Sequence, residues 1–224
     1  MVDKEALAER YRQVKATIPP HVTLIAVSKK RTVEEIQALY DLGHRDMGEN
    51  YPQELRDKAP QLPADIRWHF IGNLQSNKAK YVVPVVQMVH TVDGPRILDE
   101  LEKRSAAIGK KLEILFQVHI ALEETKHGLS PEELKELINN WDDRRWPSIT
   151  PKGLMGMATN TTNEGTVRKE FNGLKRLFDA LLARGTKAAA GFDRLSMGMS
   201  SDASIAIEEG SNMVRIGTAI FGDR

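Results

Sequence analysis

A lysine that follows a short apolar run is the residue of this 224-residue sequence best suited to covalent chemistry. Lys29 ends the run Thr23-Leu-Ile-Ala-Val-Ser-Lys29, which has the composition of a buried β-strand. An amine held at a strand end and partly desolvated has a lowered pKa, which makes it a Schiff-base nucleophile. Because Lys30 and Arg31 follow, the residues also fit a solvated basic turn. The segment alone leaves both interpretations open.

Two segments rich in glycine and hydroxyl groups are suited to binding an anion. Residues 196–202 read Ser-Met-Gly-Met-Ser-Ser-Asp, and residues 215–222 read Arg-Ile-Gly-Thr-Ala-Ile-Phe-Gly. Hydroxyls and free backbone N–H groups near a helix start favour a phosphate, and a glycine permits close backbone approach. Neither segment contains the Gly-Lys-Ser/Thr of a Walker loop or a dinucleotide fingerprint. An ordinary turn is the alternative for each.

The elements that would position these residues alternate between strand and helix patterns. Strand composition is found in eight segments, at 23–29, 46–51, 68–72, 89–93, 113–121, 152–159, 194–200 and 213–222. Helical patterns lie between them at 33–42, 52–59, 76–83, 95–108, 131–139, 164–183 and 203–209, with 4–17 ahead of the first strand. This alternation predicts an α/β protein whose parallel sheet closes into a (β/α)8 TIM barrel. Without a linker or repeat, we expect a single domain over residues 1–224.

Alternation along the predicted strands separates an inward face from an outward one. Asp46, Gly48 and Asn50 share one face of the second strand, and Arg215 and Gly217 share one face of the last. Because one strand face points into a barrel, Arg215 is a candidate buried cation. Catalytic groups of such barrels gather at the carboxyl ends of the strands, and phosphates often bind the loops after strands seven and eight.

Composition limits the class of protein. With 32 Lys and Arg against 31 Asp and Glu, the net charge is +1, so no overall field recruits nucleic acid or an anionic membrane. The sequence has no cysteine, which excludes disulfides and thiolate metal sites and suits a reducing compartment. No apolar stretch reaches the ~20 residues of a membrane span, and the first residues lack a signal-peptide pattern. We expect a cytoplasmic protein that acts as a monomer, with no membrane or nucleic-acid partner.

Five separated motifs, in order, resemble one known family. They are Ala26-Val-Ser-Lys29, Gly48-Glu-Asn-Tyr51, Trp68-His-Phe-Ile-Gly72-Asn-Leu-Gln-Ser-Asn77-Lys78, Leu195-Ser-Met-Gly-Met-Ser200-Ser-Asp202 and Val214-Arg-Ile-Gly-Thr-Ala-Ile-Phe-Gly222. Together they resemble the pyridoxal 5′-phosphate (PLP) homeostasis proteins over nearly the whole chain. The resemblance implies PLP fold type III, similar to the N-terminal barrel of alanine racemase without its second, β-rich domain. It also implies an intracellular protein that binds PLP and supplies it to other proteins without substantial catalysis.

The resemblance implies a set of cofactor-binding residues, namely Lys29, Asn50, His69, Ser200, Ser201, Arg215, Gly217 and Thr218. Lys29 would form the internal aldimine with the cofactor aldehyde. The two serines, Gly217 and Thr218 would hold the phosphate, while Asn50 and His69 would lie beside the ring or over it. For these last two, a satisfied core hydrogen bond is the alternative.

Arg215 would face the pyridine nitrogen. An arginine there disfavours ring protonation, so the cofactor becomes a weaker electron sink. Beyond PLP, the expected partners are PLP-dependent apoenzymes or a regulatory protein.

Two other classes of function remain open. His69, His90 and His119 lie on the third, fourth and fifth predicted strands, where converging imidazoles would form the metal site of a hydrolase. The expected carboxylate is missing from comparable strand ends apart from Asp93, so we expect no metal. The second class is a PLP-dependent amino-acid racemase or lyase, which needs another acid/base, commonly a tyrosine, on the far face of the cofactor. Of four tyrosines only Tyr51 sits at a predicted strand end, so we favour a non-enzymatic binding protein.

Overall fold

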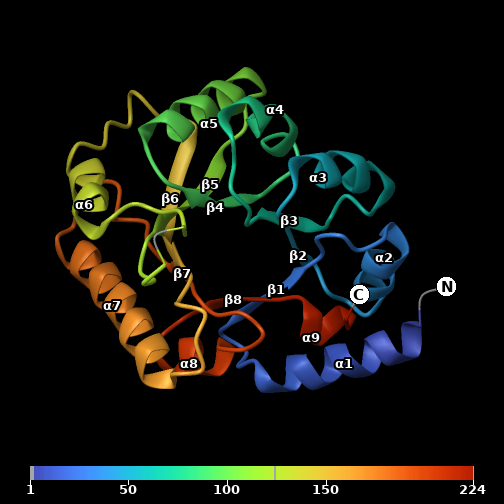
Figure 1. Cartoon of the computed structure of the whole chain (residues 1–224). Helices are drawn as coiled ribbons and strands as arrows, with labels where there is room; N and C mark the ends of the chain where they lie inside the picture. The colour runs from blue at the N-terminus through green and yellow to red at the C-terminus, as the bar shows by residue number, and fades with distance from the viewer. Residues whose placement is uncertain (1–2, 124, 224) are drawn as a thin grey trace.

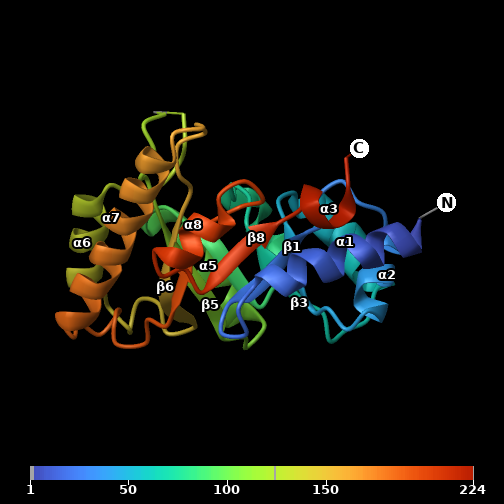
Figure 2. The ribbon, with the colours of Figure 1, turned by 90° about the horizontal axis from the view of Figure 1, so that it is seen from below.

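The protein forms a closed barrel of parallel strands surrounded by helices, seen in a computed structural model that describes residues 3–123 and 125–223 (Figures 1 and 2). Within these residues the strands pair in chain order, and the last pairs with the first, so the sheet has no free edge. The strands are β1 (Thr23–Val27), β2 (Asp46–Glu49), β3 (Arg67–Phe70), β4 (Met88–Val92), β5 (Leu112–Val118), β6 (Ile149–Gly156), β7 (Arg194–Ser196) and β8 (Met213–Ile216). The predicted (β/α)8 barrel is confirmed.

Helices follow the strands and cover the outside of the barrel. They are α1 (Lys4–Thr17), α2 (Val33–Asp41), α3 (Pro52–Lys58), α4 (Ala79–Val82), α5 (Pro95–Ala107), α6 (Pro131–Asn139), α7 (Glu164–Ala183), α8 (Ala203–Glu208) and α9 (Thr218–Phe221), with 3-10 turns at Ala59–Gln61 and Ser76–Lys78. Proline occupies the first turn of α3, α5 and α6, and Ser130 forms a capping box with Glu133. Among the described residues, none of the helices is both long and apolar enough to cross a membrane.

Two strands end earlier than their composition predicts. β1 ends at Val27 and not at residue 29, so Lys29 lies in a turn. β7 ends at Ser196 and not at residue 200, so Ser200 also lies in a turn. Polar residues follow the end of β1, whereas after β7 the buried Met197 also lies outside the strand, in the connection to α8.

The main correction concerns residues 217–222, which composition assigns to the last strand. β8 ends at Ile216, Gly217 caps a helix, and residues 218–221 form α9. Ile220 and Phe221 are buried, and α9 packs beside α1. Their apolar character therefore reflects burial in a helical turn and not strand pairing.

Two separate apolar cores lie on the two faces of the sheet. Ile114 and Phe116 of β5 belong to the large core beneath the helices. Leu115, between them, belongs to a second cluster inside the barrel, formed by Ile25, Met88, Leu115, Met155 and Met213. Arg215 follows Met213 by two residues in β8 and is 5% exposed, which confirms the predicted inward cation.

Gly153 permits the close approach of β6 to β7. The register of β5 against β6 shifts between Ile114 and Leu115, and Leu115 pairs with this glycine. The φ of Gly153 is +147°, and an added Cβ would lie 1.8 Å from the Arg194 carbonyl oxygen. Because that oxygen belongs to the backbone of the neighbouring strand, it cannot move away without disturbing the pairing.

We expect Gly153→Ala to destabilise the barrel by about 2–4 kcal/mol, because the new Cβ collides with β7 at a strained φ. Urea denaturation followed by circular dichroism measures this change. Gly173→Ala is the matched control, since Gly173 lies inside α7 and its added Cβ meets nothing within 4 Å. Helix propensity should stabilise the control by about 0.5–1 kcal/mol. Equal unfolding midpoints for the two variants would contradict this account of the β6–β7 contact.

Candidate functional site

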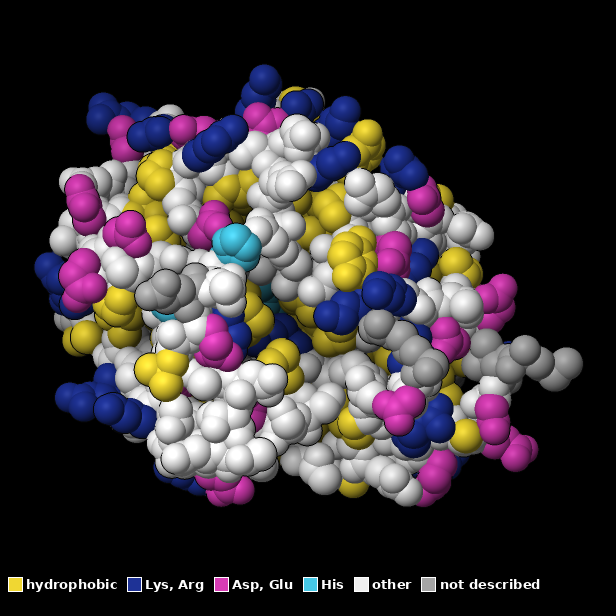
Figure 3. All heavy atoms as spheres, in the orientation of Figure 1, with side chains coloured by type: hydrophobic (Ala, Val, Ile, Leu, Met, Phe, Trp, Pro, Cys, Tyr) yellow, Lys and Arg dark blue, Asp and Glu magenta, His cyan; other side chains and the backbone are white. Residues whose placement is uncertain are grey.

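The carboxyl ends of the strands lie on one side of the barrel, which faces the viewer in Figures 1 and 3 and points upward in Figure 2. Figure 3 shows this face hollowed near its centre. Residues that follow strands here line two clefts, one of about 290 Å³ beside Asn50 and one of about 410 Å³ beside Ser201. Of the predicted site residues, those that follow a strand at this end are Lys29, Asn50, Ser200, Ser201, Gly217 and Thr218. His69 and Arg215 belong to strands and are buried.

Lys29 is half-buried in the turn that follows β1. The next residue, Lys30, has a φ of +58°, a left-handed conformation that is uncommon for a residue other than glycine. The Arg31 N–H group donates to the Ser28 carbonyl at 3.0 Å and closes the turn. The sharp change of direction holds Lys29 at the end of the strand.

A cluster of the buried Glu49 and Lys58 and the half-buried Glu54 fastens this turn to β2 and α3. Lys58 Nζ lies 2.8 Å from Glu49 Oε1 and 2.6 Å from Glu54 Oε2. It also donates to the Ser28 carbonyl at 3.0 Å, and Ser28 Oγ donates to Glu49 Oε1 at 3.0 Å. Burial raises the pKa of Glu49, while the hydrogen bond and charge of Lys58 oppose that rise. Lys58 therefore favours the ionised form of this buried carboxylate.

The same carboxylates reach the backbone beside Lys29 and at Asn50. The Lys30 N–H group donates to Glu54 Oε2 at 2.7 Å, and the Asn50 N–H group donates to Glu49 Oε2 at 3.3 Å. Asn50 Oδ1 is buried and has no hydrogen-bond partner among the described residues. Because leaving a buried amide oxygen unpaired is costly, this oxygen marks a place where a ligand would supply a donor.

Arg215 presents a buried cation in β8. Its Nη1 donates to Ser196 Oγ at 2.6 Å, and its Nη2 donates to the Gly156 carbonyl at 3.1 Å. Desolvation lowers the pKa of Arg215 to about 10, against the opposing charge of Asp202, so the group stays charged at neutral pH. Both bonded acceptors are neutral. Enclosing a charge is unfavourable, and an electron-rich ligand group beside this guanidinium would offset part of that cost.

His69 lies within β3, and protein groups engage both of its ring nitrogens. Nδ1 lies 3.0 Å from His90 Nε2, and Nε2 lies 3.2 Å from Asp46 Oδ1. The alternative interpretation of His69 was a core residue with satisfied hydrogen bonds, and these bonds are present. Its placement beside or over a cofactor ring stays a prediction.

The loop after β7 turns sharply at Gly198. This residue has a φ of +92°, and an added Cβ would lie 2.7 Å from a methyl group of α8. Asp202 is buried, and its Oδ1 accepts the Met199 N–H at 2.6 Å. Ser200 and Ser201 are exposed in the turn that precedes α8. Their hydroxyls are thus presented on a loop whose backbone is fixed on both sides.

Gly217 and Thr218 form the start of α9, immediately after β8. Ala26 of β1 pairs with Ile216 of β8, and an added Cβ on Gly217 would lie 3.2 Å from Val27 Cβ. The pairing brings the start of α9 beside the end of β1. The hydroxyl and amide groups predicted to bind phosphate therefore lie next to the turn that carries the candidate lysine.

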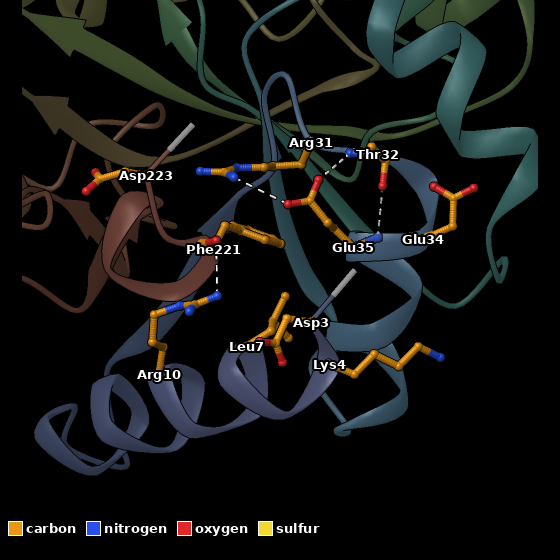
Figure 4. A pocket seen from close by; sticks show the side chains of 10 residues that line it. All are labelled: Asp3, Lys4, Leu7, Arg10, Arg31, Thr32, Glu34, Glu35, Phe221 and Asp223. Atoms are coloured by element: carbon orange, nitrogen blue, oxygen red, sulfur yellow. Dashed lines mark hydrogen bonds and ion pairs between the residues drawn. The ribbon is translucent and has the colours of Figure 1, made fainter. Parts of the chain in front are cut away.

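Two arginines hold the other end of α9 beside a cleft of about 750 Å³, and Figure 4 shows the bond between one of them, Arg10, and Phe221. Arg10 donates to the carbonyls of Ile220 and Phe221 at 3.0 and 3.2 Å. Arg31 donates to the Gly222 carbonyl. Cations at the carboxyl end of a helix satisfy its unpaired carbonyl groups. Arg31 therefore joins the turn that carries the candidate lysine to the helix that carries the predicted phosphate donors.

A metal centre finds no support in the described part of the chain. No group of three or more His, Cys, Asp or Glu side chains there could hold an ion. His69 and His90 bond to each other, whereas His119 Nε2 contacts the Glu123 carbonyl at 2.9 Å. The three imidazoles of the hydrolase hypothesis do not converge.

Sequence reasoning missed three residues around the site. Glu49 sits in the motif Gly48-Glu-Asn-Tyr51 at a position that faces the helices, and a carboxylate there signals a buried partner. The alternation of residues along β7 puts Ser196 on the face that points into the barrel, and this position indicates a contact with Arg215. Lys58 gave no signal, because its pairing depends on how α3 folds back against the turn after β1.

A family profile described as alanine racemase, N-terminal domain, matches residues 2–224. The curated relatives include a pyridoxal phosphate homeostasis protein of Aquifex aeolicus, 39% identical over 202 residues, which cover 90% of this chain and 86% of the relative. Another, from a Synechocystis species, is 37% identical over 222 residues, covering 96% and 97% respectively.

Solved structures show the same similarity. PipY of Synechococcus elongatus, solved without PLP, is 31% identical with a TM-score of 0.90, covering 96% of this chain and 100% of that one. PipY with PLP bound has a TM-score of 0.86 at 30% identity and the same coverage. An alanine racemase of Clostridium difficile shares the fold, with a TM-score of 0.78 at 16% identity, covering 97% of this chain and 56% of that one.

We expect Lys58→Met to destabilise the protein by about 3–5 kcal/mol, because the Glu49 carboxylate would stay buried without its cation. Denaturant unfolding measures the loss, and Lys58→Met/Glu49→Gln should recover part of it. Lys103→Met is the control, since this lysine is exposed on α5 and its replacement should change stability by less than about 0.5 kcal/mol. Equal losses in the single and double variants would exclude the buried charge as the cause.

Proposed function

Because the chain belongs to the pyridoxal phosphate homeostasis proteins, within the wider family of alanine racemase N-terminal domains, we propose that it binds PLP and acts in PLP homeostasis. One observation carries the assignment of the site. The β1–β8 pairing puts the strand that precedes Lys29 next to the strand that carries Arg215 and leads into α9. This neighbourhood supports a single site for an amine, a cation and phosphate donors at this end of the barrel. PipY, a relative solved with PLP bound, supports the same cofactor.

The residues at this end match the chemical groups of PLP. Lys29 Nζ would form a covalent Schiff base with the aldehyde. The hydroxyls of Ser200, Ser201 and Thr218, with the backbone N–H groups of Gly217 and Thr218, would bind the phosphate. The Asn50 amide, whose oxygen lacks a partner among the described residues, would bond to a polar substituent of the ring.

Arg215 decides which chemistry the bound cofactor performs. PLP supplies an electrophilic carbon and an electron sink, and the sink is strong only when the ring nitrogen is protonated. A guanidinium facing that nitrogen disfavours protonation. Arg215 would therefore hold the cofactor in a form that exchanges between amines but stabilises carbanions poorly. We propose a carrier and not a racemase or lyase.

A carrier needs a recipient with a competing amine. The lysine of a PLP-dependent apoenzyme can displace Lys29 by attack at the same carbon, with transfer of one proton to the departing Nζ. We therefore propose PLP-dependent apoenzymes, or a protein that regulates their supply, as partners of a monomeric barrel. We place this exchange in the cytoplasm, which suits a sequence without cysteine.

Borohydride reduction of the protein incubated with PLP should attach the cofactor irreversibly to Lys29, because reduction fixes the Schiff base. Mass spectrometry of peptides identifies the labelled lysine. Lys29→Ala should lose both the label and the absorption band while keeping the folded barrel. Lys30→Asn is the matched control, since Lys30 is exposed and asparagine tolerates its positive φ. A label on another lysine of the unmodified sequence would refute the assignment.

PLP-loaded protein should exchange the Cα proton of amino acids no faster than free PLP, because Arg215 weakens the electron sink. Mass spectrometry of amino acids incubated in heavy water measures deuterium uptake. Exchange at enzymatic rates of ~1–10³ s⁻¹ would show that the carrier proposal is wrong. Tyr51→Phe would then test the acid/base of the alternative, because Tyr51 is 42% exposed and lines the cleft beside Asn50.

A further inference from the structure

A chain of hydrogen bonds crosses the barrel interior from Arg215 to Asp46. Arg215 Nη1 lies 2.6 Å from Ser196 Oγ, which lies 3.2 Å from His90 Nδ1. His90 Nε2 lies 3.0 Å from His69 Nδ1, and His69 Nε2 lies 3.2 Å from Asp46 Oδ1. Every member except Asp46 is buried. The chain therefore joins a cation to a carboxylate through groups shielded from water.

The guanidinium limits the direction of the bonds at one end, and one arrangement follows from it when His90 is neutral. It donates and never accepts, so Ser196 Oγ accepts from Arg215. The Ser196 hydroxyl proton is then available to His90 Nδ1, which accepts in a neutral ring. His90 consequently carries its proton on Nε2 and donates to His69 Nδ1. His69 carries its proton on Nε2 and donates to Asp46.

The Asp46 carboxylate, at the other end of the chain, requires hydrogen bonds that are donated toward it. Burial acts to raise the pKa of Asp46, but hydrogen bonds from Arg67 and His69 hold it well below the usual range. Asp46 is therefore ionised and only accepts. Burial, together with the charge of Arg215, lowers the pKa of His90 well below its ordinary value, so this ring is neutral.

We propose that Ser196, His90, His69 and Asp46 are positioning residues that orient Arg215 toward the ring nitrogen of PLP. This inference rests on the proposed function. Each donor in the chain points away from Arg215, and the terminal carboxylate holds no proton to return. No proton therefore reaches the ring nitrogen through this route, and the guanidinium can only donate to it. The barrel interior thus keeps the cofactor a weak electron sink.

The competing arrangement reverses both histidines. Ser196 Oγ would then accept from Arg215 and from His90 Nδ1–H, and His90 Nε2 would accept from His69 Nδ1–H. His69 would need a second proton to donate to Asp46 as well. This arrangement places an imidazolium inside the barrel, and the two arrangements differ in the nitrogen that carries hydrogen on His90.

Nitrogen-15 NMR of the histidine side chains, recorded near neutral pH on the full chain without cofactor, identifies the protonated nitrogens directly. We expect His69 and His90 to carry hydrogen on Nε2 only. Hydrogen on Nδ1 of His90, or on both nitrogens of His69, overturns the proposal. This measurement needs no variant and no bound ligand.

Ser196→Ala interrupts the chain next to Arg215. We expect PLP affinity to fall about tenfold to hundredfold, the effect of losing one hydrogen bond to a charged group. The absorption band of the bound cofactor should shift as well, because the environment of the ring nitrogen changes. Ser196→Thr keeps the hydroxyl and should retain the original band. Ser105→Ala is the matched control, because Ser105 is equally buried, on α5, and its hydroxyl has no partner among the described residues.

The outcomes separate the two proposals. If the unmodified protein does not bind PLP, the proposed function fails, and with it the ligand that Arg215 would face. If it binds PLP but folded Ser196→Ala keeps the same affinity and spectrum, the positioning role alone is rejected. A shift that appears equally in Ser105→Ala also rejects it, because any buried serine would then have the same effect.

Discussion

The guanidinium of Arg215 lies inside a closed barrel, and the residues around it are arranged to hold a charge that water does not solvate. Its bonded acceptors are a serine hydroxyl and a backbone carbonyl. A carboxylate in direct contact would have neutralised the cation and left nothing for a ligand. The carboxylate is instead placed at the far end of the hydrogen-bonded chain, in Asp46. The interior therefore stabilises the cation and preserves its charge.

A second set of charges acts from outside the sheet. Glu49 lies on the face of β2 opposite to Gly48, and with Lys58 it fixes the backbone of the turn that follows β1. β1 has β2 on one side and β8 on the other. Lys29 is thus held through its backbone by the outer cluster and lies beside the strand that carries the inner cation. The position of Lys29 and its electrostatic environment are therefore controlled by different parts of the fold.

Sequence patterns predicted the features that depend on residues close together in the chain. Strand alternation alone placed Arg215 inside, and eight alternating units were sufficient for the barrel. Composition failed at residues 217–222, because Ile220 and Phe221 are apolar for their contact with α1 and not for a strand. The partners of His69 were also beyond prediction. They come from β2 and β4, and the registers of β2, β3 and β4 decide which side chains meet inside the barrel.

The pairing of the first strand with the last has a consequence for biosynthesis. Arg31 and Gly222, which are bonded, are 191 positions apart in the sequence. As the chain leaves the ribosome, β1 has a partner only on its β2 side until β8 has been made. Its open edge is apolar and can pair with other chains during that interval. The cofactor cannot assist these early stages, because the groups that would bind its phosphate follow β7 and β8 in the sequence and the cavity exists only once the ring of strands closes.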